Sequence, residues 1–257
     1  MKKVLLSSLG VIALSAGIYF TYQSFQEKIY KDTEVKCDFD AGICYDHKNT
    51  PITGRLQSYD KEQLISDIEY KNGKENGILK IYKTTGKIFL EGTYKDGKPH
   101  GVIKEYNDDG TLFSYDEFKN GLPHGTSIIY HKDGKPIKEW HYTDGKDSGI
   151  GKVYYPSGKL QLEVNHDKGE LKYFYENGTL NTLAHFDNHG YHGAWTIYTE
   201  DGQTTAEIVY NKGQPQSGYC IDANNQKIEF TTTDFEVFAK TNQTPCNIKK
   251  TAKNINQ

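Results

Sequence analysis

Short runs of apolar and β-branched residues recur along most of this chain, separated by polar segments that contain glycine. The runs ILKIY, VIKEY, TSIIY and AWTIY each follow a glycine and end on an aromatic residue. Runs of this length between turn signals predict β-strands. The segments TTG, DDG, KDG, PSG, ENG and EDG come next and predict turns, because glycine tolerates positive φ. The residues after each turn, such as KIFLEGTY or KPIKEWHY, predict a returning strand.

These strand pairs belong to a repeat of 23 or 24 residues. In each copy a leading glycine precedes an aromatic residue by five positions, and a turn glycine follows that aromatic residue by four. A fixed period of this size predicts an array of small supersecondary units. Six copies keep the spacing, with one shortened step before Gly169. Their aromatic residues are Tyr82, Tyr106, Tyr130, Tyr154, Phe174 and Tyr198. A degenerate copy precedes them at Gly54.

We therefore expect an all-β fold over residues 50–218, an elongated array of antiparallel β-hairpins in a continuous meander. The DGKPHG-type segments are expected to be loops that lead from one hairpin into the next. A local irregularity is expected between Gly158 and Gly169, where the step shortens and this segment is reduced to NHDKG. Neither strand of the hairpin alternates cleanly between apolar and polar residues, so the sequence does not indicate which sheet face is buried.

The segments NGKENGILKIYKTTG, DGKPHGVIKEYNDDG and NGLPHGTSIIYHKDG carry a family resemblance. Their spacing resembles the MORN repeat, and more closely its bacterial variant found in exported proteins and in the YwqK-like antitoxin family. The resemblance covers about residues 50–218. It implies an elongated antiparallel β array used for binding, with no particular partner, since such arrays carry many functions.

Residues 1–22 predict an export signal and not part of the fold. Lys2 and Lys3 precede an apolar run from Val4 to Phe20. Seventeen residues at helical rise give about 25 Å, which is short for a membrane span but workable. Ala13 to Ser15 also has the small-x-small form of a cleavage site, so an uncleaved anchor and a cleaved signal peptide are both open. In either case we expect a periplasmic protein or one anchored in a bacterial inner membrane and facing the periplasm.

The four cysteines predict two disulfides that staple the ends of the array. Residues 23–49 are expected to form a stalk and an N-terminal cap, residues 219–248 a C-terminal cap with a strand and a short helix, and residues 249–257 a flexible tail. Four cysteines permit three connectivities. Seven hairpin steps would separate the array ends by about 70 Å, whereas disulfide partners need Cα atoms within about 7 Å. Pairing of Cys37 with Cys44 and of Cys220 with Cys246 is therefore expected, with free thiols as the alternative.

Two equivalent positions in the repeat carry polar side chains. Glu91, Glu139, Glu163 and Glu207 each stand five residues after a turn glycine. Copies of one position lie about 10 Å apart along a regular array, too far to share a metal ion. These acids are therefore expected to bond turn amides or a neighbouring lysine or tyrosine. His100, His124 and His192 each precede a leading glycine and are expected to hold a loop or, alternatively, to form a binding face that titrates near neutral pH.

Two tryptophans, Trp140 and Trp195, depart from the repeat at their positions. Residues that depart from a repeat are candidates for determining partner specificity. The alternative is that each tryptophan fills a local gap in the packing. The candidate partner-binding residues are therefore His100, His124, Trp140, His192 and Trp195.

Composition and motifs argue against an enzyme. The chain lacks a G-x-S-x-G elbow, a phosphate-binding loop of the G-x-x-x-x-G-K-[ST] type and an H-E-x-x-H pair. The net charge of -3 gives no sign of nucleic-acid binding, which needs a clustered basic face. No catalytic residue, cofactor or metal site is predicted. We expect a non-enzymatic scaffold that binds a protein partner. The antitoxin resemblance suggests that this partner is a toxin, which the protein would neutralise. The alternative is an envelope scaffold that binds lipid headgroups or glycan.

Overall fold

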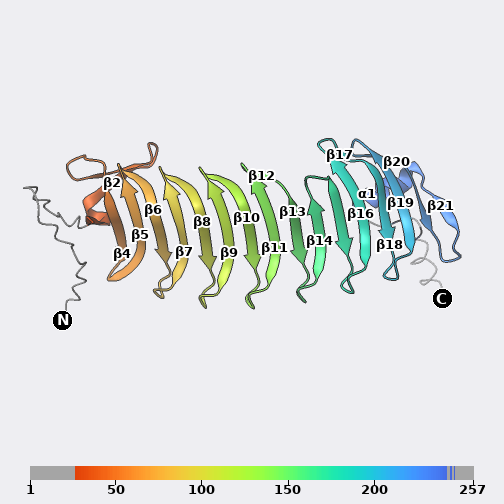
Figure 1. Ribbon diagram of the computed structural model, residues 1–257, viewed down its shortest axis with the longest axis horizontal. Coiled ribbons are helices and arrows are strands. Elements are labelled where there is room, and N and C mark those ends of the chain that lie inside the picture. Colours follow the sequence, from red (N-terminus) through yellow and green to blue (C-terminus); the bar gives the residue numbers. More distant parts are fainter. Residues whose placement is uncertain (1–26, 242–243, 245, 247–257) are drawn as a thin grey trace, which may run out of the picture.

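The computed structural model describes residues 27–241, 244 and 246 and shows one long, ribbon-like sheet (Figure 1). The expected export signal at 1–22 and tail at 249–257 lie outside the described residues. Within the described part, no helix is long and apolar enough to cross a membrane. Nineteen strands form the long sheet, and two more form a separate hairpin. The expected all-β array is confirmed.

The elements alternate between strand and tight turn along most of the chain. They are β1 (Ile29–Lys31), a 3₁₀ helix η1 (Asp32–Glu34), β2 (Val35–Asp38), β3 (Ile43–Asp46), β4 (Gly54–Asp60), β5 (Gln63–Lys71), β6 (Lys74–Tyr82), β7 (Ile88–Lys95), β8 (Lys98–Tyr106), β9 (Leu112–Lys119), β10 (Leu122–Tyr130), β11 (Pro136–Thr143), β12 (Lys146–Asp147), β13 (Ile150–Tyr154), β14 (Leu160–Asn165), β15 (Glu170–Phe174), β16 (Leu180–Asp187), β17 (Gly190–Tyr191), β18 (Gly193–Tyr198), β19 (Thr204–Asn211), β20 (Gln214–Ile221), β21 (Lys227–Glu229) and α1 (Thr232–Thr241).

Two kinds of turn connect the strands, one at each long edge of the sheet. At one edge the chain reverses through a loop closed by a glycine with positive φ, as where the Gly86 amide donates to the Lys83 carbonyl at 2.8 Å. At the other edge two residues with positive φ suffice, as in Asp96–Gly97 between β7 and β8. This is the geometry of a type I′ turn, which Asn-Gly and Asp-Gly favour.

The expectation that the DGKPHG segments are loops is wrong. Lys98 pairs with Lys95 across the turn, and residues 98–101 are the first part of β8. The reason is that Asp-Gly alone reverses the chain, which leaves the following residues free to join the next strand. The strands therefore have eight or nine residues over much of the array. Two-residue turns, and not longer loops, connect these hairpins to one another.

One face of the sheet, here called the inner face, carries most of the buried side chains. Directly paired residues share a sheet face, and successive pairs trace the row Leu56, Ile68, Leu79, Gly92, Ile103, Asp116 and Ser127 from β4 to β10. Leu56, Leu79 and Ile103 are buried. Gly92 makes room for its large neighbour, since a Cβ there would lie 2.9 Å from Cγ1 of Ile103.

A second aromatic series, which the sequence analysis did not single out, packs opposite the leading glycines on the inner face. Gly54 pairs with Tyr70, Gly77 with Tyr94, Gly101 with Phe118, Gly125 with Tyr142 and Gly193 with Tyr210. Tyr70 is buried, and burial together with nearby Glu75 raises the pKa of its hydroxyl. Because glycine lacks a side chain, the ring opposite can lie over the backbone of the neighbouring strand.

The irregularity predicted between Gly158 and Gly169 is present. β14 and β15 have six and five residues, and Asn165 pairs with Glu170 across a longer loop in place of a two-residue turn. The side-chain oxygen of Asn165 accepts a 3.0 Å hydrogen bond from the Lys168 amide, which orders this loop.

The N-terminal cap packs on the first strands of the array. β2 and β3 form a hairpin in which Cys37 and Cys44 are bonded, with Cα atoms 4.0 Å apart. A core cluster joins Tyr30 and Cys44 of the cap, and Ile52 just before β4, to Leu56 and Tyr70 of the inner face. Within the expected stalk and cap at residues 23–49, the described residues from Glu27 onward pack on the array and do not extend from it, because β1 pairs with β4 in parallel and Tyr30 is buried.

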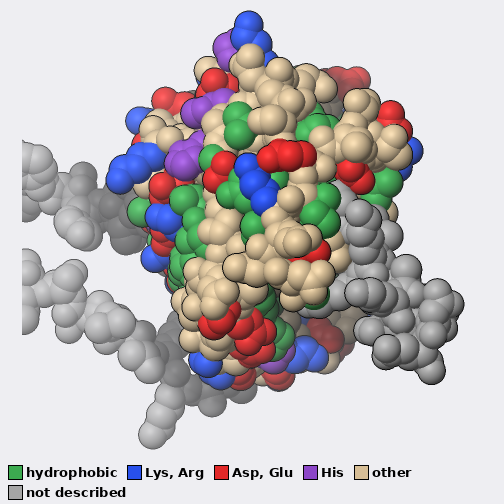
Figure 2. Space-filling view, turned by 90° about the vertical axis from the view of Figure 1, so that its right-hand side faces the viewer, with side chains coloured by type: hydrophobic (Ala, Val, Ile, Leu, Met, Phe, Trp, Pro, Cys, Tyr) green, Lys and Arg blue, Asp and Glu red, His purple; other side chains and the backbone are tan. Residues whose placement is uncertain are grey.

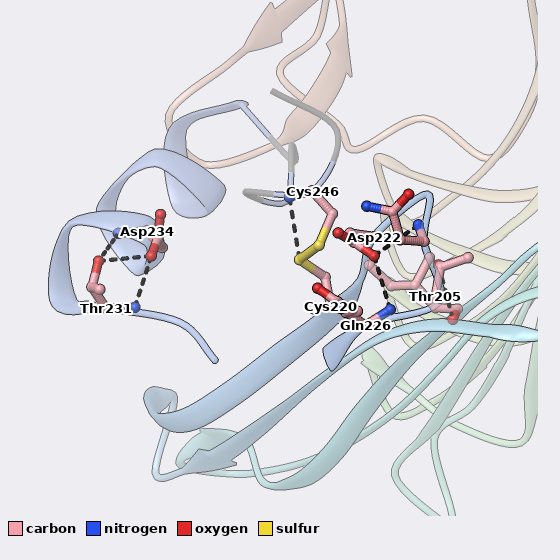
Figure 3. The surroundings of a disulfide bond; sticks show 9 residues. Thr205, Cys220, Asp222, Gln226, Thr231, Asp234 and Cys246 are labelled. Carbon is pink, nitrogen blue, oxygen red and sulfur yellow. Dashed lines mark hydrogen bonds between the residues drawn. A yellow bond between two sulfur atoms is a disulfide. The ribbon is translucent and has the colours of Figure 1, made fainter. Parts of the chain in front are cut away.

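The C-terminal cap also packs on the inner face. Cys220 and Cys246 form the second predicted disulfide (Figure 3), with Cα atoms 6.0 Å apart. Their core cluster includes Ala206. Phe238 of α1 is buried, and its ring lies 6.4 Å from that of Trp195. The Cys37–Cys44 bond therefore closes a hairpin within the N-terminal cap, whereas the Cys220–Cys246 bond ties the C-terminal cap to β20.

Candidate binding surface

Two of the three candidate histidines brace neighbouring turns. His100 Nδ1 accepts a 3.4 Å hydrogen bond from the amide of Asn120, and His124 Nδ1 accepts one of 3.3 Å from the amide of Asp144. Asn120 and Asp144 have positive φ and begin the two-residue turns one repeat further on. His192 instead faces the ring of His185 at 6.3 Å. Seen from the C-terminal end, most of the visible histidine surface lies toward the upper edge among charges of both signs, and some lies at the lower edge (Figure 2).

The two candidate tryptophans fill space on the inner face. A Cβ on Gly151 would lie 2.8 Å from the Trp140 ring, so the ring occupies the space that a side chain at position 151 would need. Lys138 Nζ lies 4.4 Å from the centre of the same ring, a cation–π contact. Trp195 packs edge-on to Tyr191 at 4.7 Å and reaches Phe238 of the cap. The structure does not gather the tryptophans and the histidines into one site.

The glutamate series lies on the face opposite to the inner face, here called the charged face. Glu91 pairs with Lys80 on one side and Lys104 on the other, and Glu163 pairs in the same way with Lys152 and Lys172. Opposite charges on directly paired strands stabilise a sheet by about 0.2 to 1 kcal/mol per pair. The expected bonding to a neighbouring tyrosine is present for Glu91 and Glu139.

Tyrosine hydroxyls complete this arrangement. Tyr106 donates a 2.7 Å hydrogen bond to Glu91, and Tyr154 donates one of 3.0 Å to Glu139. Burial, followed by the bond to the carboxylate, raises the pKa of each of these tyrosines to about 12. Residues 27–241, 244 and 246 contain no group of three or more His, Cys, Asp or Glu side chains that could hold a metal ion. These acids and tyrosines are bonded to one another.

An exposed apolar series that the sequence analysis missed lies beside the glycine-closed turns. In each hairpin the pairing shifts at the repeat aromatic: Glu105 pairs with Ser114, but Tyr106 pairs with Leu112. Phe113 is therefore an extra residue, a β-bulge, and bulges reorient side chains. The equivalent residues of the two flanking hairpins are Phe89 and Ile137. Phe89, Phe113 and Ile137 are 43%, 40% and 39% exposed, and we call them the apolar stripe.

Charged groups surround the stripe. A cavity of about 430 Å³ lies between Phe89 and Phe113 and is lined also by Lys83, Asp108 and Lys132. Lys83 Nζ forms a 2.8 Å ion pair with Asp108 and donates to the Tyr106 carbonyl at 2.9 Å. This lysine lowers the pKa of the Asp108 carboxyl. The stripe is thus a row of apolar side chains with fixed charges of both signs at its margin.

The repeat provides its own comparison for this position. In the three later hairpins, the bulge residues are polar: Gln161, Asn181 and Thr205. Since the same bulge forms with either kind of residue, the fold does not require an apolar side chain there. The signal available in the sequence was the residue three positions after each turn glycine, which is apolar in three successive copies and polar in the next three.

The comparisons with known proteins agree with this architecture. The MORN repeat variant matches six segments, which are residues 75–96, 99–120, 123–144, 148–168, 167–188 and 191–212. The fourth and fifth segments overlap at the shortened step, where the structure has its irregular loop. A comparison with curated proteins gave no match. From its six matched repeats and its meander of hairpins, the chain belongs to the MORN repeat variant family.

Proposed function

We propose that this protein is a non-enzymatic, exported scaffold that binds a protein partner through the apolar stripe, and that it acts as an immunity protein that occludes a toxin. The observation that carries the proposal is the row of Phe89, Phe113 and Ile137, exposed at the same position of three successive hairpins. Hairpins advance by two strand spacings, or about 10 Å, so the stripe extends over about 20 Å. This length suits a protein surface better than a small molecule.

The chemistry of the stripe supports protein binding. When a partner removes exposed apolar side chains from water, the complex is stabilised by about 25 cal/mol per Å² of buried apolar surface. Aromatic residues are common among the side chains that dominate binding energy. The bulges and paired strands hold Phe89 and Phe113 in place before any partner arrives, so little ordering cost remains to be overcome on association.

Export is supported by the two disulfides, since such bonds persist in oxidising compartments and are rare in the cytosol. The apolar N-terminal segment expected as a signal or anchor is consistent with the same destination. The antitoxin role rests on the family resemblance of the repeats together with a rigid, extended surface suited to steric occlusion.

A photo-crosslinking amino acid placed in the exported protein tests the surface. We expect a discrete protein adduct from positions 89, 113 and 137 and none from the matched positions 161, 181 and 205. Equal adducts from both sets, or none from either, would refute binding through the stripe. For the antitoxin role, co-expression with a toxin encoded beside its gene should protect cells, and the triple variant Phe89→Ser, Phe113→Ser, Ile137→Ser should not.

The alternative of an envelope scaffold that binds lipid headgroups or glycan makes a different prediction. Vesicle flotation of the folded protein would detect lipid binding directly. Flotation that the triple stripe variant abolishes, combined with no protein adduct at positions 89, 113 and 137, would replace the protein partner by a lipid surface.

A further inference from the structure

The repeat changes at position 199, directly after the aromatic residue that ends β18. In the two preceding copies the equivalent residue is a tyrosine that reaches the next hairpin. The hydroxyl of Tyr155 donates a 2.7 Å hydrogen bond to the Phe174 carbonyl. The hydroxyl of Tyr175 donates one of 2.7 Å to the Tyr198 carbonyl. Thr199 is too short for this contact, and its hydroxyl bonds within its own turn instead.

A cavity of about 430 Å³, here called the cap cavity, lies beside Thr199 and extends to Ile221. Ile221 ends β20 as Tyr198 ends β18, so the cap cavity lies where a tyrosine at position 199 would reach. The C-terminal cap contributes Thr244 to the wall, as well as Cys246 of the disulfide (Figure 3). The volume is in the range of ligand pockets, about 300 to 1,000 Å³.

The lining of the cap cavity is polar and nearly uncharged. Among its described residues only Asp222 is charged, and Oδ1 of Asp222 already accepts hydrogen bonds of 2.9 Å and 2.8 Å from the amides of Asn224 and Gln226. The other polar side chains carry hydroxyls, which both donate and accept, or neutral amides. They are Thr199, Gln203, Thr204, Thr205, Asn225 and Thr244. An apolar ligand would leave these groups without partners, which is unfavourable.

Thr244 provides a second observation that points to a ligand. Its side chain is largely buried, with 6% of the residue exposed, and it lines the cap cavity. Within the part of the chain that the structure describes, its hydroxyl has no hydrogen-bond partner. Buried polar groups of folded proteins are nearly always hydrogen bonded. A ligand hydroxyl in the cap cavity would supply the missing bond.

We propose that the cap cavity binds a neutral sugar. The hydroxyls of a sugar match the threonine hydroxyls and the amide of Asn225, because each such group can donate or accept. An acidic sugar is disfavoured, since its carboxylate would face that of Asp222 without a lysine or arginine in the lining. The cap cavity is at the C-terminal end of the array, away from the apolar stripe, and the proposal does not depend on the proposed function.

Saturation-transfer NMR of the full exported chain tests the proposal. The probes are glucose, galactose, mannose and N-acetylglucosamine, with glucuronate and galacturonate as charged counterparts. We expect transfer to at least one neutral sugar and weaker transfer to its uronate. Absence of transfer to all four neutral sugars would overturn the proposal. A uronate that binds as tightly as its neutral sugar would contradict the role given to Asp222.

Replacing threonine by valine removes a hydroxyl and keeps the shape of the side chain. Thr204→Val and Thr244→Val should each raise the dissociation constant of the bound sugar by about three- to tenfold, the effect of one lost hydrogen bond. Thr84→Val is the matched control, because Thr84 lies in the glycine-closed turn between β6 and β7 and outside the cap cavity. Unchanged binding by both Thr204→Val and Thr244→Val would place the sugar elsewhere and refute the proposal.

Thr199→Tyr restores the residue of the two preceding copies. Its ring should occupy the cap cavity and its hydroxyl should reach the Ile221 carbonyl, so sugar binding should be lost. Peptide mapping under non-reducing conditions should confirm that Cys220 and Cys246 remain bonded in this variant. A correctly bonded Thr199→Tyr protein that binds sugar as well as the wild type would contradict the proposed site.

Discussion

Gly169 is the residue whose replacement we expect to be most damaging at the irregular step of the array. Its φ is +61°, and a Cβ there would overlap the carbonyl oxygen of Phe186 on β16. The Phe186 amide donates a 2.8 Å hydrogen bond to the Gly169 carbonyl, which fixes the two backbones against each other. A backbone oxygen cannot rotate away as a side chain can. Gly169→Ala must therefore displace β16 from the segment that precedes β15.

Gly178, in the turn between β15 and β16, is the matched control. Its φ is +90°, but a Cβ there would meet nothing within 4 Å. Alanine in a left-handed conformation costs about 1 to 2 kcal/mol at either position. Only at Gly169 does overpacking add about 1 to 3 kcal/mol and a weakened hydrogen bond about 0.5 to 1.5 kcal/mol. We expect a loss of about 3 to 6 kcal/mol for Gly169→Ala and about 1 to 2 kcal/mol for Gly178→Ala.

Urea unfolding gives the overall loss, and hydrogen exchange shows where it falls. The second measurement is needed because repeat arrays unfold in parts, with each unit stabilised by its neighbours. Protection should fall in β14, β15 and β16 and stay near the wild-type level in β6 and β7. Equal destabilisation by the two alanine variants would refute the steric argument. Loss of protection spread evenly from β6 to β20 would refute the nearest-neighbour argument.

Two further predictions concern alkaline pH and the caps. Tyr106 and Tyr154 have pKa values raised to about 12 from 10, so they contribute stability that is complete below pH 10 and is lost as pH rises toward 12. The double variant Tyr106→Phe, Tyr154→Phe should flatten this part of a urea-midpoint profile, and an unchanged slope would contradict it. Cys37→Ser with Cys44→Ser should loosen only the N-terminal cap by about 2.5 kcal/mol, and Cys220→Ser with Cys246→Ser only the C-terminal cap by about 3.5 kcal/mol. Limited proteolysis should then cut within the affected cap, whereas early cuts in the central hairpins would show that the ends also stabilise the middle.

Local patterns were sufficient to predict the repeat and its strands. Glycines at a fixed spacing mark the places where the chain must adopt positive φ, and the β-prone runs between them can form only short extended segments. The disulfide pairing followed from the length of the array, because ends far apart cannot exchange partners. The sequence departs from the repeat after Gly218, which predicted a cap with a short helix, and that helix is α1.

The buried face could not be predicted because two features hide its alternation. A bulge at each repeat aromatic shifts the register by one residue, so a period of two does not persist through a hairpin. The inner row also changes from apolar to polar at Asp116 and Ser127, which hydrogen bond to each other at 2.6 Å. The apolar stripe was missed for the same reason, since only the observed pairing shows that Phe89, Phe113 and Ile137 occupy bulges.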